Sequence, residues 1–547
     1  MLREKINAVY SKILEIDSPY DFQQDLFECI LNNNFPIIMK APTGSGKTEA
    51  VLAPFLYQFM INEFFIAPRL IYVLPMRVLV NNIAERIKRY ASKVSQHIDV
   101  KVQHGESPNA PFFMADIIVT TLDQFLYGFA RSSQQVQKHI DIPAGAIASS
   151  LIVFDEAHMY RDEMTFSIMR ALLEILQSSK IPFLLMTATM PATLENSLFE
   201  NKSVFREVTK IKGKLSLNNT LKIQLQDHPI FEKGAVNLDD EVLELVNGKK
   251  TLVVLNQVER AQAVYREIKN RLGLTDEDIV LLHSRFTRED RKRHESAALS
   301  FFANKKKQRS GNLDDGLKIV VSTQVLEAGM DFSAEVLLTE LAPADSLVQR
   351  AGRCARYKDE VGQMIVFPVE SEKGHLPYEK KCMEVTKEWL ELNSNVNMKD
   401  FDAMCSFVDI LSYKANDFEA SDTLFDLYEC TLYADTRPQN IQLRKGKPVT
   451  LIVVDPSLGK GRKKEDKISS IIESCDISTC SVQIDYKVGW GLMKKGLINF
   501  ELNFNAVLGK WEARKTREIF PFKHYVLESN NYDAEFGVKA NVSTYVL

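Results

Sequence analysis

Two short segments of the chain carry residue types that could bind and hydrolyse a nucleoside triphosphate. The first is Lys40–Thr48, KAPTGSGKT, which follows the apolar run Phe35–Met39 and precedes a helical-looking segment. Glycines let consecutive backbone N–H groups point at a phosphate, and the helix N-terminus adds partial positive charge. Lys47 would then reach the β- and γ-phosphates, and the Thr48 hydroxyl would bind Mg²⁺. The alternative is a surface turn. The other loop residues expected to contact nucleotide are Thr43, Gly44, Ser45 and Gly46.

The second segment is Asp155-Glu156-Ala157-His158, which comes directly after the apolar run Leu151–Phe154. A carboxylate at a strand end can hold Mg²⁺, and its neighbour can orient and deprotonate an attacking water. We therefore assign Asp155 to the metal and Glu156 to the water. The alternative, an acidic loop that caps a helix, does not explain the position downstream of a phosphate loop.

Two further groups of polar residues fit the same chemistry. Gln23 lies close enough upstream of the loop to hydrogen-bond an adenine edge, because its amide is both donor and acceptor; Gln24 is the competing choice. On one continuous helix, Gln349, Arg353 and Arg356 would share a face at i, i+4 and i+7. Such arginines could grip phosphate oxygens bidentately and stabilise transition-state charge. A solvated basic helix face is the alternative.

The elements that must position these residues are apolar, β-branched runs that alternate with helical segments. This alternation predicts βαβ units and parallel sheets, with functional residues beyond the carboxyl ends of the strands. The expected strands of the first half are 70–74, 117–121, 151–154 and 183–186. The last of these runs into Thr187-Ala188-Thr189, whose hydroxyls could link the nucleotide site to a neighbouring domain. The second half repeats the pattern at 251–255, 278–282, 318–322, 334–341 and 363–369.

Composition restricts the class of protein. The 547 residues are 45% hydrophobic and 26% charged, with a net charge of −4, as in an ordinary globular protein. Basic residues for nucleic acid must then be concentrated in grooves. Seven scattered cysteines without a CxxC pair suggest reduced thiols in a cytoplasmic protein, and no run of residues is apolar enough for a membrane span.

Taken in order, these motifs resemble those of a superfamily 2 helicase of the DEAH type, over about residues 20–370. APTGSGKT, DEAH and TAT match the first domain of that family, and LPMRVLV at 74–80 resembles its strand-contacting motif. The segment 321–356, VSTQVLEAGMDFSAEVLLTELAPADSLVQRAGRCAR, resembles the helicase subunit of type I CRISPR interference systems. RNA helicases of the superfamily usually read GRTGR where this chain has Gly352–Arg356.

The resemblance implies an α/β fold with two tandem RecA-like domains, 1–210 and 211–375. A linker helix at 376–400 and a smaller mixed α/β accessory domain at 401–547 would follow. It also implies ATP and Mg²⁺ as cofactors and translocation on single-stranded DNA, on the strand displaced in a guide-RNA R-loop. The positions it implies for DNA contact are Arg77, Thr121, Arg285 and Thr323. It places Asp331 at the nucleotide and His158, Thr187 and Thr189 in coupling.

One departure from the family concerns DNA cutting. Many members carry a nuclease domain with a His-Asp metal motif, but no His-Asp dipeptide occurs among the nine histidines here. We therefore expect a separate HD-type nuclease subunit, as in subtype I-A, together with a CRISPR RNA-guided surveillance complex as partner. Two other interpretations remain: an RNA helicase or DNA-repair translocase, and a nucleic-acid-binding module that uses ATP only as a switch.

Overall fold

A computed structural model describes residues 2–105, 107–160, 163–213, 218–302, 317–326, 333–370, 374–394, 396–411, 421–432, 448–505 and 509–539. The chain forms two compact units. The first comprises Met1–Asn218, Pro343–Gly352 and Asn397–Lys445; the second comprises Asn219–Ala342, Arg353–Val396 and Gly446–Leu547. Within the described residues, no helix is both long and apolar enough to span a membrane.

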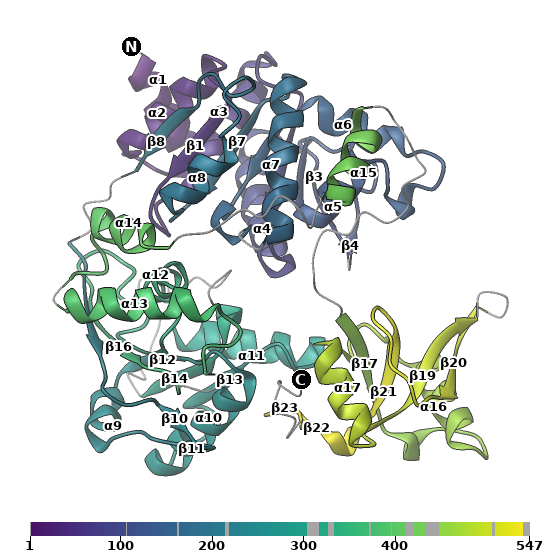
Figure 1. The fold of residues 1–547 in the computed structure, drawn as a ribbon. Helices are drawn as coiled ribbons and strands as arrows, with labels where there is room; N and C mark the ends of the chain where they lie inside the picture. The colour runs from purple at the N-terminus through teal and green to yellow at the C-terminus, as the bar shows by residue number, and fades with distance from the viewer. Residues whose placement is uncertain are drawn as a thin grey trace. The chain divides into compact units, whose positions relative to one another are not determined.

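The first unit is built on an eight-stranded sheet with the order β4-β3-β5-β2-β6-β7-β1-β8 (Figure 1). All neighbouring strands are parallel except β3 and β4. The strands are β1 (Ile37–Lys40), β2 (Arg69–Leu74), β3 (Val100–His104), β4 (Ser107–Pro108), β5 (Ile117–Thr121), β6 (Ser150–Phe154), β7 (Phe183–Thr187) and β8 (Thr209–Lys212). The central strands are buried on both faces, which explains their continuous apolar sequence.

Helices cover this sheet on both faces, as a parallel sheet requires. One core contains Phe125, Phe154 and Leu172, which brings α5 and α7 onto the sheet. The helices of this unit are α1 (Leu2–Val9), α2 (Asp21–Leu31), α3 (Lys47–Ile61), α4 (Arg77–Val94), α5 (Leu122–Phe129), α6 (Asp141–Ala148), α7 (Glu163–Ser178), α8 (Ala192–Leu198), α12 (Ala344–Ala351), α14 (Phe401–Asp409) and α15 (Ser421–Leu432). Tyr10–Leu14 forms a short π-helical turn.

The second unit contains a six-stranded, all-parallel sheet with the order β13-β14-β12-β15-β16-β9. Its strands are β9 (Thr220–Leu225), β12 (Lys250–Val254), β13 (Ile279–Leu282), β14 (Lys318–Ser322), β15 (Val336–Glu340) and β16 (Val361–Phe367). Its helices are α9 (Asp240–Val246), α10 (Val258–Leu272), α11 (Arg288–Phe301) and α13 (Lys380–Leu392), and β10 (Phe231–Glu232) and β11 (Ala235–Val236) form a small hairpin. The two parallel sheets confirm the predicted fold class.

The same unit ends in a mixed five-stranded sheet with the order β18-β17-β21-β19-β20. Its elements are β17 (Pro448–Val454), α16 (Lys464–Ser474), β18 (Ser481–Asp485), α17 (Tyr486–Lys494), β19 (Ile498–Asn505), β20 (Lys510–Lys515) and β21 (His524–Glu528). The last described elements are β22 (Tyr532–Asp533) and β23 (Gly537–Val538). The predicted mixed α/β accessory domain is confirmed in kind; the four-part division of the chain remains a prediction.

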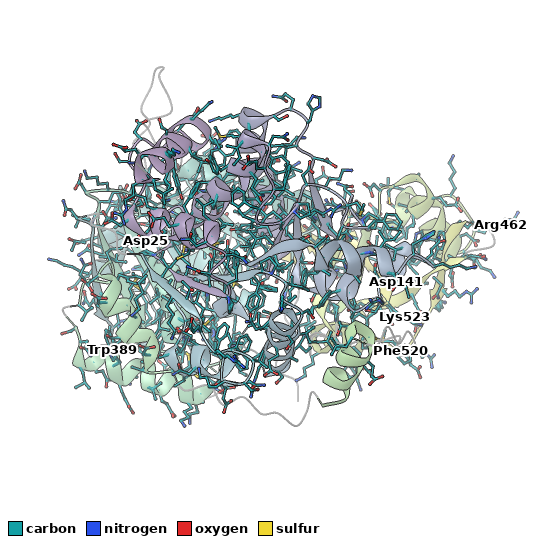
Figure 2. The ribbon with its side chains drawn as sticks, turned by 90° about the horizontal axis from the view of Figure 1, so that it is seen from above. Asp25, Asp141, Trp389, Arg462, Phe520 and Lys523 are labelled. Atoms are coloured by element: carbon teal, nitrogen blue, oxygen red, sulfur yellow. The ribbon has the colours of Figure 1, made fainter. Side chains whose placement is uncertain are left out.

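The sequence contains two strongly basic runs, at residues 305–309 and 460–464. Residues 305–309 lie outside the described residues. Residues 460–464 are exposed, and Figure 2 shows Arg462 pointing away from the fold.

Candidate nucleotide site

The phosphate loop joins β1 to the first turn of α3. Gly44 and Gly46 have φ of 79° and 82°, a left-handed conformation that other residues rarely adopt, and Gly46 is the N-cap of α3. A Cβ atom at Gly46 would lie 2.7 Å from Gln23 Nε2, so a side chain there would displace that amide. The Oγ of Ser45 is buried and has no hydrogen-bond partner in the described part of the chain. The loop therefore forms a backbone cradle at a helix N-terminus, which suits an anion.

Gln23 and Gln24 have different environments. Gln23 Nε2 donates to Gly46 O at 3.1 Å, and Gln23 Oε1 accepts from the Tyr20 N–H at 2.9 Å. Gln24 Nε2 instead donates to Asn7 Oδ1 at 2.7 Å. Gln23 is thus the glutamine that contacts the loop, and its amide holds the cradle against α2.

Lys47 is almost buried and lies over the start of the loop. Its Nζ donates to Ala41 O at 3.1 Å and to Pro42 O at 3.2 Å. Both acceptors are neutral carbonyls, so within the described residues the ammonium makes no hydrogen bond to an anionic group. A phosphate oxygen would be a stronger acceptor for this ammonium than either carbonyl.

A hydrogen-bonded chain connects the phosphate loop to the end of β6. Thr48 Oγ1 lies 3.2 Å from the Tyr72 hydroxyl, and Tyr72 donates to Asp155 Oδ2 at 2.6 Å. Tyr72 is fully buried in the centre of β2, next to β6 in the sheet. Sequence reasoning missed this residue. The available signal was a tyrosine inside an apolar strand, because a buried phenol needs a hydrogen-bond partner.

The two carboxylates at the end of β6 are held in an unfavourable arrangement. Burial, then the Glu156 carboxylate, raises the pKa of Asp155 to about 6, although Lys47 opposes the shift. Glu156 has φ of 51°, in the left-handed region where a residue other than glycine is strained. Its buried Oε2 has no hydrogen-bond partner within the described residues. These features suit a site that binds a cation and a polar ligand.

The oxygen atoms at this site suit Mg²⁺ that is bound partly by the substrate, rather than a metal ion that is held by protein side chains alone. Within the described residues, no group of three or more His, Cys, Asp or Glu side chains could hold an ion. Mg²⁺ is usually bound through one or two carboxylates together with substrate phosphates and water. Asp155, together with the hydroxyl of Thr48, is such a donor set.

A second chain of hydrogen bonds runs from Asp155's neighbours to helix α12. Gln349 Nε2 lies 2.9 Å from His158 Nε2, and His158 Nδ1 lies 3.0 Å from Thr187 Oγ1, which donates to Thr189 O at 2.8 Å. Because the Gln349 amide can only donate through its nitrogen, His158 Nε2 accepts and its proton lies on Nδ1. All four residues belong to the first unit, so the DEAH and TAT segments and α12 form one connected network.

The prediction that Gln349, Arg353 and Arg356 share a helix face is wrong for the two arginines. Helix α12 ends at Ala351, and Gly352 is its C-cap. Beyond it the backbone pairs with Ala334, which donates to Arg353 O and accepts from the N–H of Ala355, each at 2.9 Å. This long-range pairing outcompetes the next helical turn. Of the three predicted residues, only Gln349 lies on the helix.

The expected DNA-contacting positions lie at the carboxyl ends of strands in their own sheets. Thr121 ends β5 and Thr323 follows β14, and both are buried. Arg77 begins α4 after β2, and nothing further is described of its side chain. Arg285 follows β13 and makes an ion pair with Glu259 at 2.7 Å. Asp331 lies outside the described residues.

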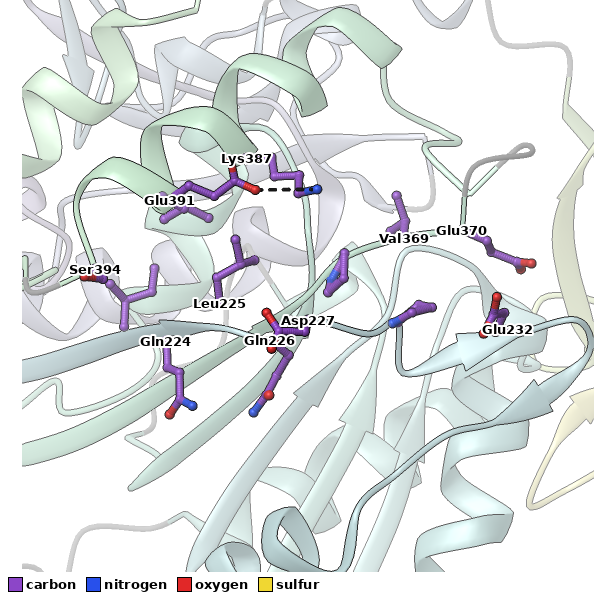
Figure 3. Close-up of a pocket in the computed structure, with 14 residues that line it drawn as sticks. Gln224, Leu225, Gln226, Asp227, Glu232, Val369, Glu370, Lys387, Glu391 and Ser394 are labelled. Atoms are coloured by element: carbon purple, nitrogen blue, oxygen red, sulfur yellow. Dashed lines mark ion pairs between the residues drawn. The ribbon is translucent and has the colours of Figure 1, made fainter.

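One cavity in the described structure lies away from the nucleotide site. A cavity of about 580 Å³ lies beside the edge strand β9 and helix α13 in the second unit (Figure 3). Asp227, Glu232, Glu370 and Glu391 line it, with Lys387 paired to Glu391 at 3.5 Å. None of the predicted site residues lines this cavity, and its carboxylates would repel phosphate.

Comparisons with known proteins relate this chain to helicases. Residues 20–197 match the DEAD/DEAH box helicase family, and residues 247–359 match the C-terminal part of the CRISPR-associated nuclease/helicase Cas3 family. The CRISPR-associated helicase Cas3 of Thermoproteus tenax is 32% identical over 385 residues, which cover 66% of this chain and 61% of that protein. The chain therefore spans about three fifths of the length of this relative.

Solved structures show the same fold at low sequence identity. The crystal structure of T. fusca Cas3-AMPPNP matches with a TM-score of 0.71 at 18% identity, over 95% of this chain and 68% of that chain. A chain in the structure of a CRISPR RNA-guided surveillance complex, pre-nicking, matches with a TM-score of 0.59 at 18% identity, over 93% of this chain and 67% of that chain.

Proposed function

We propose that this chain, which contains a DEAD/DEAH box helicase domain and resembles the Cas3 helicases as its sequence predicted, is an ATP-dependent helicase of CRISPR interference. It would translocate on single-stranded DNA, on the strand displaced in a guide-RNA R-loop. Two hydrogen-bonded chains carry the proposal: one runs from the phosphate loop through Tyr72 to Asp155, and the other runs from His158 to Gln349. The two chains meet in the Asp155–His158 segment, which can relay the state of the phosphate site to α12.

The substrate of hydrolysis is ATP, with Mg²⁺ as cofactor. Lys47 would exchange its two carbonyl acceptors for phosphate oxygens, and Thr48 and Asp155 would hold the metal. When bound, Mg²⁺ neutralises phosphate charge. Burial and then repulsion from Glu156 raise the pKa of Asp155, and a cation beside Asp155 would offset that repulsion.

Glu156 would position and deprotonate the attacking water. Its buried Oε2 accepts no hydrogen bond within the described residues and lies 3.6 Å from His158 Nδ1, so it is available to accept from a water. Arg353 and Arg356 belong to the second unit, and we propose that they stabilise the charge that develops on the phosphate. If they do so, substitution of either arginine should abolish ATP turnover while ATP binding is retained.

The DNA contacts are proposed for Arg77, Thr121, Arg285 and Thr323, and a nucleotide contact for Asp331. All four DNA positions end or follow parallel strands, at the edge of a sheet where functional residues gather, which supports the assignment. We also propose two partners, a CRISPR RNA-guided surveillance complex and a separate HD-type nuclease subunit.

The experiment is a steady-state ATPase assay of the full chain with single-stranded DNA, with RNA and without nucleic acid. We expect DNA to stimulate hydrolysis more strongly than RNA of the same sequence. Stimulation by RNA alone would favour an RNA helicase. ATP binding with no turnover under any condition would favour a nucleic-acid-binding module switched by ATP.

A further inference from the structure

The last described residues of the chain fold back onto the parallel sheet of the second unit. We call Asn531–Val538 the C-terminal clamp; it contains β22 and β23. Figure 1 shows these two short strands near α11, and the contacts below place the clamp against α10 and α11. Clamp and helices belong to the same compact unit. The segment they enclose is the loop His283–Thr287 between β13 and α11, which carries Arg285.

Both backbone groups of Arg285 are hydrogen-bonded, one of them to the clamp. Its carbonyl accepts the N–H of Val538 at 3.0 Å, and its own N–H donates to His283 Nδ1 at 3.1 Å. Gly537 has φ of 75°, and a Cβ atom there would lie 2.6 Å from Arg285 O. The clamp therefore approaches this loop so closely that only glycine fits at position 537.

The clamp also fixes the end of the loop where α11 begins. The Tyr532 hydroxyl accepts the N–H of Thr287 at 3.0 Å and donates to Asp290 Oδ2 at 2.6 Å. Thr287 is the N-cap of α11, and its own side chain accepts from the N–H of Asp290. One phenol thus satisfies a backbone donor and a carboxylate at a helix start.

Helix α10 anchors the clamp itself. Gln262 Nε2 donates to Phe536 O at 2.6 Å, and Tyr265 and Lys269 both bond Glu535 Oε1, at 2.8 and 2.6 Å. The Phe536 ring meets Tyr265 edge-on at 5.5 Å. Glu259, on the same helix, is the ion-pair partner of Arg285. The backbone and side chain of Arg285 are therefore held from two sides, by the clamp and by α10.

We propose that the C-terminal clamp positions Arg285 for contact with the nucleic-acid backbone, with Tyr532 and Gly537 as positioning residues. The inference rests on the proposed function, because Arg285 is a proposed DNA contact. It adds that residues about 250 positions away in the chain set the affinity of that contact. A pre-ordered arginine binds a phosphate without the cost of ordering its loop first.

The test uses Tyr532→Phe and Gly537→Ala in the full chain. Tyr525→Phe is the matched control, because its buried hydroxyl also accepts one backbone N–H, that of Phe520 at 2.7 Å, but lies on β21 of the mixed five-stranded sheet. The first readout is amide hydrogen exchange of the peptide that spans 283–287. The second is the concentration of oligothymidylate that gives half-maximal ATPase stimulation, with hydrolysis in the absence of DNA as reference.

Both clamp variants should exchange faster at 283–287 and need about three- to tenfold more oligothymidylate, as expected for the loss of one or two hydrogen bonds. ATPase activity without DNA should stay at the wild-type level, and the control should match wild type in every readout. Unchanged exchange in both variants, or faster exchange with unchanged DNA dependence, would overturn the inference. A wild-type ATPase indifferent to DNA would defeat the proposed function instead, and exchange alone would then decide whether the clamp holds the loop.

Discussion

The amide nitrogen of Gln349 lies 2.9 Å from Nε2 of His158, although 191 positions separate the two residues in the chain. Gln349 comes from α12, which follows a strand of the second unit's sheet, yet it belongs to the first unit. The contact fixes the tautomer of His158 and so directs the proton on Nδ1 to Thr187. A change at the phosphate site can reach α12 through this histidine.

Replacing Gln349 by Met keeps the length of the side chain but removes the donor to His158. We expect turnover of ATP with DNA present to fall about fivefold or more, as for loss of one buried hydrogen bond, with ATP affinity changed less than twofold. Steady-state kinetics and ¹⁵N chemical shifts of the labelled histidines measure both effects. An unchanged His158 tautomer would contradict the role given to Gln349.

The two glutamines near the N-terminus provide a paired test. Gln23→Ala removes the bond that holds the phosphate loop at Gly46, whereas Gln24→Ala removes only a bond to Asn7. We expect the KM for ATP to rise about tenfold in the first variant, the effect of one to two hydrogen bonds, and to stay near wild type in the second. Equal effects in both variants would show that the loss reflects general damage to α2.

Tyr72→Phe removes the hydroxyl that joins Thr48 to Asp155. The Tyr72 hydrogen bond lowers the pKa of Asp155, so its loss should raise that pKa and shift the acidic limb of the pH–rate profile upward. We expect kcat/KM for ATP at neutral pH to fall about tenfold. Tyr525→Phe, which lies in the C-terminal mixed sheet, is the control for loss of a buried phenol hydroxyl. An unshifted acidic limb would contradict the assignment.

Asp155→Asn should stabilise the nucleotide-free protein while it abolishes hydrolysis. The pKa of Asp155 is raised to about 6, so its ionised form costs stability in the folded state. That cost is absent below pH 4, grows between pH 4 and 6, and is fully present above pH 6. At pH 7.5 we expect the variant to gain about 1–3 kcal/mol in free energy of unfolding.

Calorimetric melting between pH 4 and 8 measures this difference, which should shrink as the pH falls. Asp278→Asn serves as a control of opposite sign, because hydrogen bonds from Thr275 lower the pKa of Asp278 and its ionised form favours the fold. A stability gain of Asp155→Asn that did not depend on pH would contradict the origin proposed for it.

The strands and the phosphate loop could be predicted from sequence because their signals are local. The run Ile117–Thr121 forms β5 with the expected bounds, and Leu151–Phe154 lies within β6. Parallel strands buried on both faces read as continuous apolar runs, and their carboxyl ends share one edge. That shared edge is why the sequence alone predicts that Asp155 and Thr187 lie at one site.

What the sequence could not predict depends on contacts between distant residues. The helix that carries Gln349 ends at Ala351 because the following backbone pairs with Ala334, and nothing local in QRAGRCAR indicates that pairing. Tyr72 reaches Asp155 only through the alignment of β2 beside β6. Helix α14, beyond residue 400, belongs to the first unit, which its own amphipathic pattern does not indicate.

The most direct test of the central claim is the ATPase activity of Glu156→Gln in the full chain with single-stranded DNA. Glutamine keeps the size of the side chain but cannot accept the proton of the attacking water. We expect turnover to fall at least about 10²-fold, while Lys47 and Asp155 still bind ATP with affinity near wild type. Wild-type turnover in this variant would contradict hydrolysis at this site and the motor function that depends on it.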